Sequence, residues 1–110
     1  MTFELISGVW SGYYEQGGDR YEQQMTLEFA DGLIRGDGID GLGEFTLEGE
    51  YRVDGSDVRV GWVKTYNGAH SVLYLGAARG AALAGKWKLP GTSGGFALQA
   101  VRRMGGGEIE

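Results

Sequence analysis

The sequence predicts an all-β domain, and three observations lead to this class. Glycine accounts for 22 of the 110 residues and proline for one, with no fixed glycine period, which disfavours long helices and excludes a collagen-like chain. Apolar residues make up 42% of the chain and include three Trp, six Tyr and four Phe, enough to build a core. Glycine-rich turns separate runs of alternating apolar and polar residues, which is typical of short antiparallel strands.

Length and charge narrow the class of protein further. A chain of this length fits one domain, which we expect at 1–104, followed by a flexible tail at 105–110. The formal net charge of −5 argues against a nucleic-acid partner, because phosphate binding needs clustered Lys and Arg. The N-terminus lacks a basic-then-apolar signal pattern and no apolar run is long enough to span a membrane, so we expect a cytoplasmic protein without a membrane partner. The chain contains no Cys, and we expect no cofactor.

The first two predicted strands meet at a glycine turn. Ser7–Glu15 is followed by Gly17 and Gly18, which favour a tight turn. Tyr21–Phe29 then alternates cleanly, with aromatic and apolar side chains plus Gln23 on one face and charged or polar side chains on the other. This period of two predicts a strand with one buried face.

The third and fourth strands follow the Asp31-Gly32 turn. Leu33–Ile39 carries two glycines on its inner face, and we expect Trp10 or Trp87 to press against that bare backbone. Glu44–Val53 alternates as cleanly as the second strand, which again predicts one buried face.

The second half of the chain divides in the same way. Asn67-Gly68 is a strong hairpin signal, because both residues tolerate a positive φ. A loop is expected at 90–95, where Pro, Gly, Thr and Ser cluster. The four strands predicted here are Asp57–Tyr66, His70–Ala78, Ala81–Leu89 and Phe96–Arg103.

Eight consecutive hairpin strands make a meander whose edges need cover, and closing the sheet removes those edges. We therefore predict an eight-stranded antiparallel up-and-down β-barrel, with a two-layer sandwich as the alternative. A barrel of this size is either filled by its own side chains or holds one small ligand.

Two patterns resemble known barrels. An opening Gly8-Val9-Trp10 and a late Gly85-Lys86-Trp87 resemble calycin-type barrels, of which the avidins are similar in length. The segment 36–45 and the spacing Lys64-x-Tyr66-x3-His70-x-Val72-x-Tyr74-x-Gly76 are similar to small glycine-rich barrel domains that bring no agreed activity. The likeness to avidins implies architecture only, because their biotin-contacting residues do not match this chain position by position.

The length of the turn at Asn67-Gly68 leaves two registers open, and a one-residue slip turns every side chain of the next strand over. A two-residue turn places Leu73 inside the barrel. A three-residue turn places His70 opposite Lys64, with Tyr74 inside. The resemblance to glycine-rich barrels favours the three-residue turn, which we adopt.

In that register polar and aromatic side chains gather at one end of the lumen. The candidate ligand-binding residues are Lys64, Tyr66, His70 and Tyr74, with Trp62, Trp87 and Tyr14 as apolar walls. This set fits a non-enzymatic barrel that binds a small apolar or anionic molecule. The alternative is a structural or oligomerisation domain in which the same residues form a polar plug above a filled core.

Residue spacing gives no support to a catalytic or metal-binding interpretation. His70, the only histidine, could serve a small isomerase or cyclase, or bind haem iron. Asp37, Asp40 and Glu44 offer oxygen ligands for Ca²⁺, but Asp-Gly turns explain them without a metal.

The adopted register leaves apolar side chains on the outside of the fifth, sixth and eighth strands. These side chains are Val63, Leu73, Leu75 and Val101. An outer patch of this kind is typical of a subunit interface, so we expect a homo-oligomer.

Overall fold

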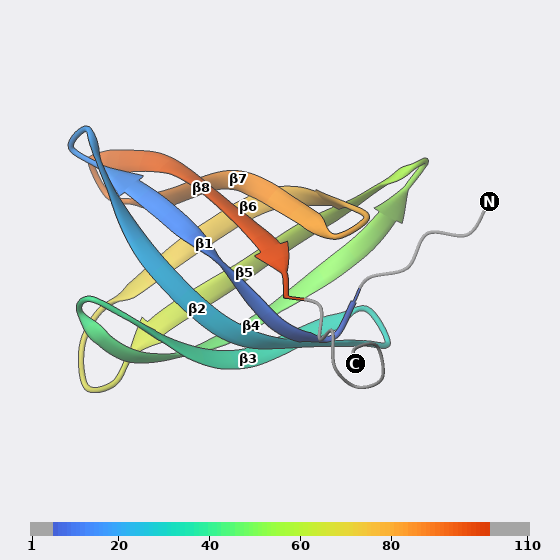
Figure 1. Cartoon of the computed structure of the whole chain (residues 1–110), viewed down its shortest axis with the longest axis horizontal. Coiled ribbons are helices and arrows are strands. Elements are labelled where there is room, and N and C mark those ends of the chain that lie inside the picture. The colour runs from blue at the N-terminus through green and yellow to red at the C-terminus, as the bar shows by residue number, and fades with distance from the viewer. Residues whose placement is uncertain (1–5, 102–110) are drawn as a thin grey trace, which may run out of the picture.

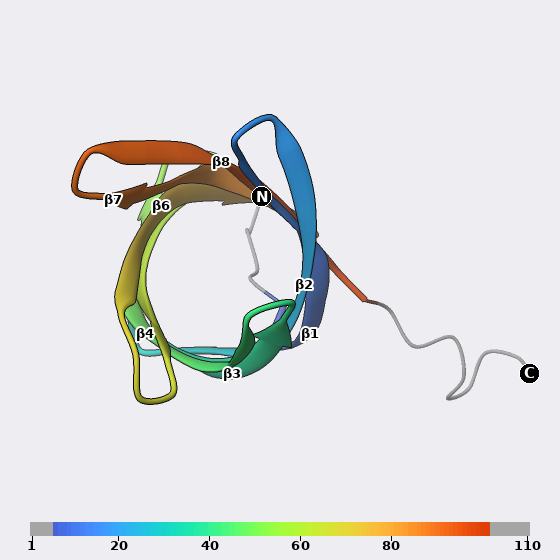
Figure 2. The same ribbon diagram turned by 90° about the vertical axis from the view of Figure 1, so that its left-hand side faces the viewer.

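Eight antiparallel strands close into a barrel in the computed structural model, which describes residues 6–101 (Figure 1). Each strand pairs with the next, and β1 pairs with β8 to complete the ring seen end-on in Figure 2. The strands are β1 (Gly8–Gln16), β2 (Asp19–Ala30), β3 (Leu33–Asp40), β4 (Gly43–Asp54), β5 (Asp57–Tyr66), β6 (Ser71–Arg79), β7 (Ala82–Leu89) and β8 (Thr92–Ala100). The predicted all-β class, strand number and up-and-down order are confirmed.

Two predictions concern the ends of the chain. The predicted domain limit at 104 and tail at 105–110 lie outside the described residues. Within residues 6–101, no helix is long and apolar enough to cross a membrane.

Tight turns join β1 through β5 where the sequence predicts them. Between β2 and β3, Asp31 and Gly32 have φ angles of 53° and 78°, the left-handed conformation that two-residue hairpin turns require. Asp31 is the only described residue other than glycine with a positive φ.

Aromatic rings fill the barrel interior. Trp10, Trp62 and Trp87 are no more than 3% exposed. Trp62 stacks on Tyr74 with 5.6 Å between ring centroids and tilts against Phe96 at 5.7 Å. The remaining buried apolar side chains are Tyr14, Met25, Leu27, Ile34, Phe45, Leu47, Val58, Val60, Tyr66, Val72, Ala78, Leu83 and Leu98. These side chains occupy the lumen that a ligand would need.

Inward-facing glycines let neighbouring strands and rings approach closely. A Cβ atom on Gly36 would meet Leu27 and Leu47, and one on Gly38 would lie 2.7 Å from the Phe45 ring. The prediction that Trp10 or Trp87 covers this backbone is therefore wrong. The side chains that cover it come from β2 and β4, because those strands flank β3 directly.

In the β5–β6 hairpin the predicted side chains point into the barrel, but the residues that pair across the two strands differ from the prediction. Tyr74 faces inward beside Trp62, as the adopted register requires. Lys64, however, pairs with Val72 and not with His70. The turn encloses three residues, as adopted, but it lies one position later: Tyr66 N donates to His70 O at 3.2 Å, so the enclosed residues are 67–69 and not 66–68. A shift of two residues preserves the facing, so only the pairing was wrong.

The last hairpin is tighter than predicted. The chain turns at Pro90 and Gly91 and enters β8 at Thr92, so the expected loop at 90–95 is wrong. Gly94 lies within β8 against the Trp87 ring, where a Cβ atom would be 2.6 Å from Trp87 Nε1. That indole nitrogen donates to Glu15 O at 2.7 Å, which ties β7 to the end of β1.

Candidate functional site

Strand alternation places a lysine inside the barrel. On β5, every second side chain from Val58 to Tyr66 is buried, and Lys64 lies in this series. It is wholly buried, near the end of the barrel that carries the β3–β4 and β5–β6 turns (Figure 2). A buried ammonium group without partners is very costly, so its surroundings decide whether the fold tolerates it.

All three N–H groups of the Lys64 ammonium have acceptors. Nζ donates to Asp40 Oδ2 at 2.6 Å, to Gln23 Oε1 at 2.9 Å and to Tyr74 OH at 3.4 Å. The ammonium also lies 4.2 Å from the centroid of the Phe45 ring, a cation–π distance. The donor capacity of Lys64 is used within the protein.

Asp40 joins the lysine to the rim of the barrel. Its Oδ2 accepts from Lys64 and, at 2.6 Å, from Tyr66 OH, while its Oδ1 accepts from Leu42 N at 2.8 Å. The Leu42 bond shows that Asp40 does stabilise the β3–β4 turn, as an Asp-Gly turn predicts. The same carboxylate is also the counter-ion of the buried lysine, which the turn signal did not indicate.

The electrostatics of the ion pair follow from its burial. Burial lowers the pKa of Lys64 below its usual value, although the Asp40 carboxylate opposes that change. Burial alone would raise the pKa of Asp40, but hydrogen bonds from Lys64, Tyr66 and Leu42 outweigh it and hold this pKa below its usual value. The carboxylate is therefore the charged partner around which the cluster is organised.

The surrounding phenols are held protonated. Burial raises the pKa values of Tyr66 and Tyr74 well above 10.0, and the nearby Asp40 charge raises both further. The pKa of Tyr14 is raised for the same two reasons. None of these phenols is suited to act as a base near neutral pH.

Two buried donors have no acceptor within the described residues. They are Gln23 Nε2 and Trp62 Nε1. The orientation of the Gln23 amide is fixed, because the Lys64 ammonium has no lone pair and must face the amide oxygen. An unpaired buried donor costs roughly 1–3 kcal/mol, so these two atoms mark where an acceptor would be favoured.

His70 does not reach the lumen, and the expectation that it lines the interior is wrong. Its side chain is exposed in the turn beyond the barrel rim, with its ring centroid 5.2 Å from that of Tyr66. The turn begins one residue later than predicted and leaves His70 opposite Tyr66, the last residue of β5, even though its position in the alternation is an inward one. Haem inside the barrel could not take its axial ligand from His70 in this position.

The other predicted site residues divide into two groups. Lys64, Tyr66, Tyr74 and Tyr14 come together around the ammonium, with ring centroids 4.9–5.4 Å from Nζ. Trp62 and Trp87 lie on either side of Tyr74 on the inner face of the barrel. Trp62 is paired with Tyr74 between β5 and β6, and Trp87 is paired with it between β6 and β7. They are core side chains, and the Trp87 indole is already engaged by Glu15 O.

Sequence reasoning missed two members of the cluster. The alternation places Gln23 on the inner face of its strand but does not identify it as a partner of Lys64, and the Asp-Gly turn pattern explains Asp40 without a partner. A polar side chain on the otherwise apolar inner face of β2 is the signal that could have indicated a buried partner for Gln23. Asp40 and Lys64 are separated by 24 positions and meet only through the register of three strands.

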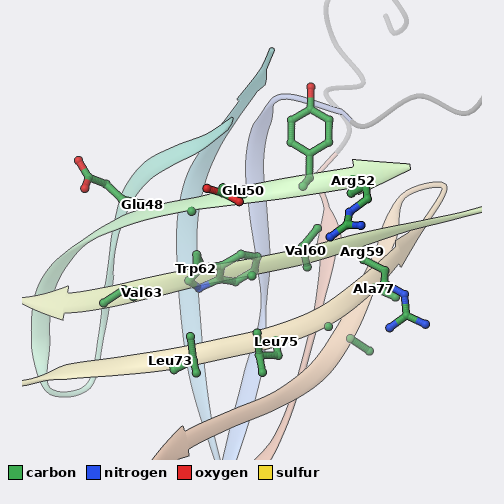
Figure 3. A pocket seen from close by; sticks show the side chains of 15 residues that line it. Glu48, Glu50, Arg52, Arg59, Val60, Trp62, Val63, Leu73, Leu75 and Ala77 are labelled. Atoms are coloured by element: carbon green, nitrogen blue, oxygen red, sulfur yellow. The ribbon is translucent and has the colours of Figure 1, made fainter. Parts of the chain in front are cut away.

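Hollows in the structure lie on the barrel's outer surface. One, of about 1140 Å³, is lined by parts of β1, β2 and β3 and is bordered by Gln23 and Asp40. A second, of about 870 Å³, lies over β4, β5 and β6 around Val63, Leu73 and Leu75 (Figure 3). Within residues 6–101, no three His, Asp or Glu side chains are grouped to hold a metal ion.

Comparison with protein-family models, with curated proteins and with solved structures gave no match.

Proposed function

We propose that this chain is a non-enzymatic β-barrel with a filled core that acts through its outer surface as an assembly domain. The observation that carries the proposal is the state of Lys64, which is fully buried with all three N–H donors engaged by the protein itself. Such a cluster stabilises one arrangement of strands and leaves no free charge for a substrate.

The outer surface supplies the apolar area that assembly needs. Val63, Leu73 and Leu75 are 43%, 40% and 43% exposed and lie together across β5 and β6 (Figure 3). Val101, predicted in the same patch, lies elsewhere: it follows β8, and its N–H donates to Val9 O. The proposed assembly surface is thus the β5–β6 face without Val101.

Sedimentation velocity over a range of concentrations tests the assembly role. We expect the wild type to associate and Leu73→Ser/Leu75→Ser to remain monomeric with an unchanged melting temperature. The matched control is Leu33→Ser/Ile39→Ser, which removes two comparably exposed apolar side chains on β3 and should leave association intact. A wild type that stays monomeric at millimolar concentration contradicts the proposal.

A second candidate is a binding site for a small apolar or anionic molecule. The unpaired Gln23 Nε2 favours it, since a ligand acceptor beside the Lys64 cluster would satisfy that atom. The residues near it are Lys64, Tyr66, Tyr74 and Tyr14. Binding would raise stability by RT ln(1 + [L]/Kd), so thermal shifts with a panel of small carboxylates and amides test it. Shifts that are equal in the wild type and in Gln23→Met speak against this site.

The resemblance to calycin and avidin-like barrels stays a proposal about fold class. It is supported by eight strands in up-and-down order and by the two Gly-x-Trp strands at β1 and β7. It assigns no ligand.

A further inference from the structure

Charged side chains flank the exposed apolar patch in an ordered way. Cross-strand pairing creates one row of outward residues through Glu48, Val63, Leu73 and Lys88, and a second row through Glu50, Gly61, Leu75 and Lys86. We call these eight residues the β4–β7 face. Both rows run from an acidic residue on β4, through two residues without charge, to a basic residue on β7.

The charges at the two flanks are available to a partner. Glu48, Glu50, Lys86 and Lys88 are all exposed, and none forms an ion pair with another residue in 6–101. Figure 3 shows the two glutamates on β4 beside Val63 of β5 and the leucines of β6. The face therefore carries an acidic edge, an apolar centre and a basic edge.

We infer that the β4–β7 face binds a second copy of itself about a twofold axis parallel to β5 and β6. This inference rests on the assembly role proposed above and names its partner and geometry. Rotation about this axis reverses the order of the strands in the partner, so that β4 faces β7, but leaves each residue at the same height along the strand direction. Glu48 then faces Lys88 of the partner subunit, and Glu50 faces Lys86 of the partner subunit, so that the contact contains four ion pairs.

The charge pattern selects this axis over the alternative. A twofold axis in the interface but perpendicular to the strands would place the acidic edge of one copy on the acidic edge of the other, and the basic edges likewise. Like charges brought together at an interface are strongly unfavourable. Of the two ways to stack this face on itself along the strand directions, only the parallel axis places opposite charges together.

The apolar centre is complementary under the same axis. Val63 faces Leu73 of the partner subunit, and Leu75 faces the partner's Gly61. Gly61 has no side chain and lies among the residues that line the hollow over β4–β6. Leu75 of the same copy lies over it, 3.1 Å from where a Cβ atom on Gly61 would stand. The leucines of the two copies would therefore pack against each other over the glycine.

The area of the β4–β7 face limits how tightly two copies can bind each other. With strands about 4.8 Å apart and same-face residues about 6.8 Å apart, the two rows and their margins cover roughly 300–400 Å² per copy. A stable interface buries about 800 Å² per partner, so we expect a weak, concentration-dependent dimer.

Cysteine cross-linking tests the axis, since the chain has no cysteine of its own. We expect Glu50→Cys mixed with Lys86→Cys to give a dimer with a short bis-maleimide, and neither variant alone to do so. In a dimer of Glu50→Cys alone, the two introduced thiols would lie roughly 14 Å apart laterally, three strand spacings. Cross-linking of either variant with itself overturns the parallel axis.

Charge reversal tests the flanks by sedimentation equilibrium. Glu48→Lys/Glu50→Lys should weaken dimerisation more than about tenfold, and adding Lys86→Glu/Lys88→Glu in the same chain should restore it. The control Glu22→Lys/Glu28→Lys makes the same change in net charge on β2 and should have little effect. If Leu73→Ser/Leu75→Ser abolishes dimerisation but charge reversal does not change it, the twofold inference fails while the assembly role stands. If the wild type never dimerises, both fail.

Discussion

Lys64 Nζ lies 2.6 Å from Asp40 Oδ2, and both side chains are inaccessible to solvent. The other ion pairs among residues 6–101 are exposed on the surface. Exposed pairs contribute little to stability, whereas breaking a buried pair leaves a charge without compensation. This one contact links β3 to β5 across β4 and fixes the polar end of the barrel.

Removing one partner of this pair should destabilise the fold severely. We expect Lys64→Met or Asp40→Asn to lower the free energy of unfolding by about 3–5 kcal/mol in urea titrations. The double variant should lose less than the sum of the two, because it strands no charge. Arg59→Ala, which breaks the exposed Arg59–Asp54 pair, should cost less than about 1 kcal/mol. Additive single effects would show that the pair does not couple.

Stability should fall steeply in alkali. The pKa values of Tyr66 and Tyr74 are raised in the folded state by burial, so above pH 10.0 the unfolded chain loses phenolic protons that the folded chain retains. Unfolding therefore becomes more favourable as pH rises. The lowered pKa of Lys64 acts in the opposite sense below pH 10.5, since the unfolded chain then binds the extra proton. A rise in tyrosinate absorbance before unfolding that is lost in Tyr66→Phe or Tyr74→Phe would show that these phenols ionise in the folded state and would contradict this explanation.

Tyr66→Phe should reduce this alkaline dependence. The variant removes the titrating phenol but also one donor to Asp40, so its stability at pH 7 should drop as well. The measurement is the slope of the unfolding free energy between pH 9 and 11. If Tyr66→Phe shows the same slope as the wild type, groups other than Tyr66 cause the loss of stability in alkali.

Acid should weaken the fold through Asp40. Its pKa lies below 3.8 when folded, so its contribution is complete above that pH and is lost as pH falls toward the folded pKa. We expect the acid limb of the stability curve to be shallower in Asp40→Asn than in the wild type. Asp54→Asn, on the exposed surface, serves as the control.

Glycines under neighbouring rings should tolerate no side chain. A Cβ atom on Gly38 would lie 2.3 Å from Gln24 O and 2.7 Å from the Phe45 ring, so Gly38→Ala should cost about 1–3 kcal/mol through overpacking. Gly41→Ala is the matched control, because nothing lies within 4 Å of its Cβ position. Its effect should stay within about 0.5 kcal/mol in thermal or urea unfolding. Equal losses at the two sites would refute the packing explanation.

The local pattern of the sequence determined which residues form strands and, for most strands, which side is buried. Alternation placed Lys64 and Gln23 inside, because side chains on a strand point to opposite faces in turn. For Tyr74 alternation left two registers open, and the resemblance to glycine-rich barrels favoured the inward one. Asp31-Gly32 and the other glycine turns ended the strands near the predicted positions, because few residues adopt a positive φ.

Only the tertiary structure decided what those inward side chains meet. The partner of Lys64 is Asp40, two strands away, and the shift that carries His70 beyond the rim is only two residues. Alternation repeats every two residues, so a shift of two leaves the pattern unchanged and the sequence cannot report it. Register across a closed barrel is set by all the strand pairs together, down to the contact of β1 with β8, and it is this closure that brings distant residues to one site.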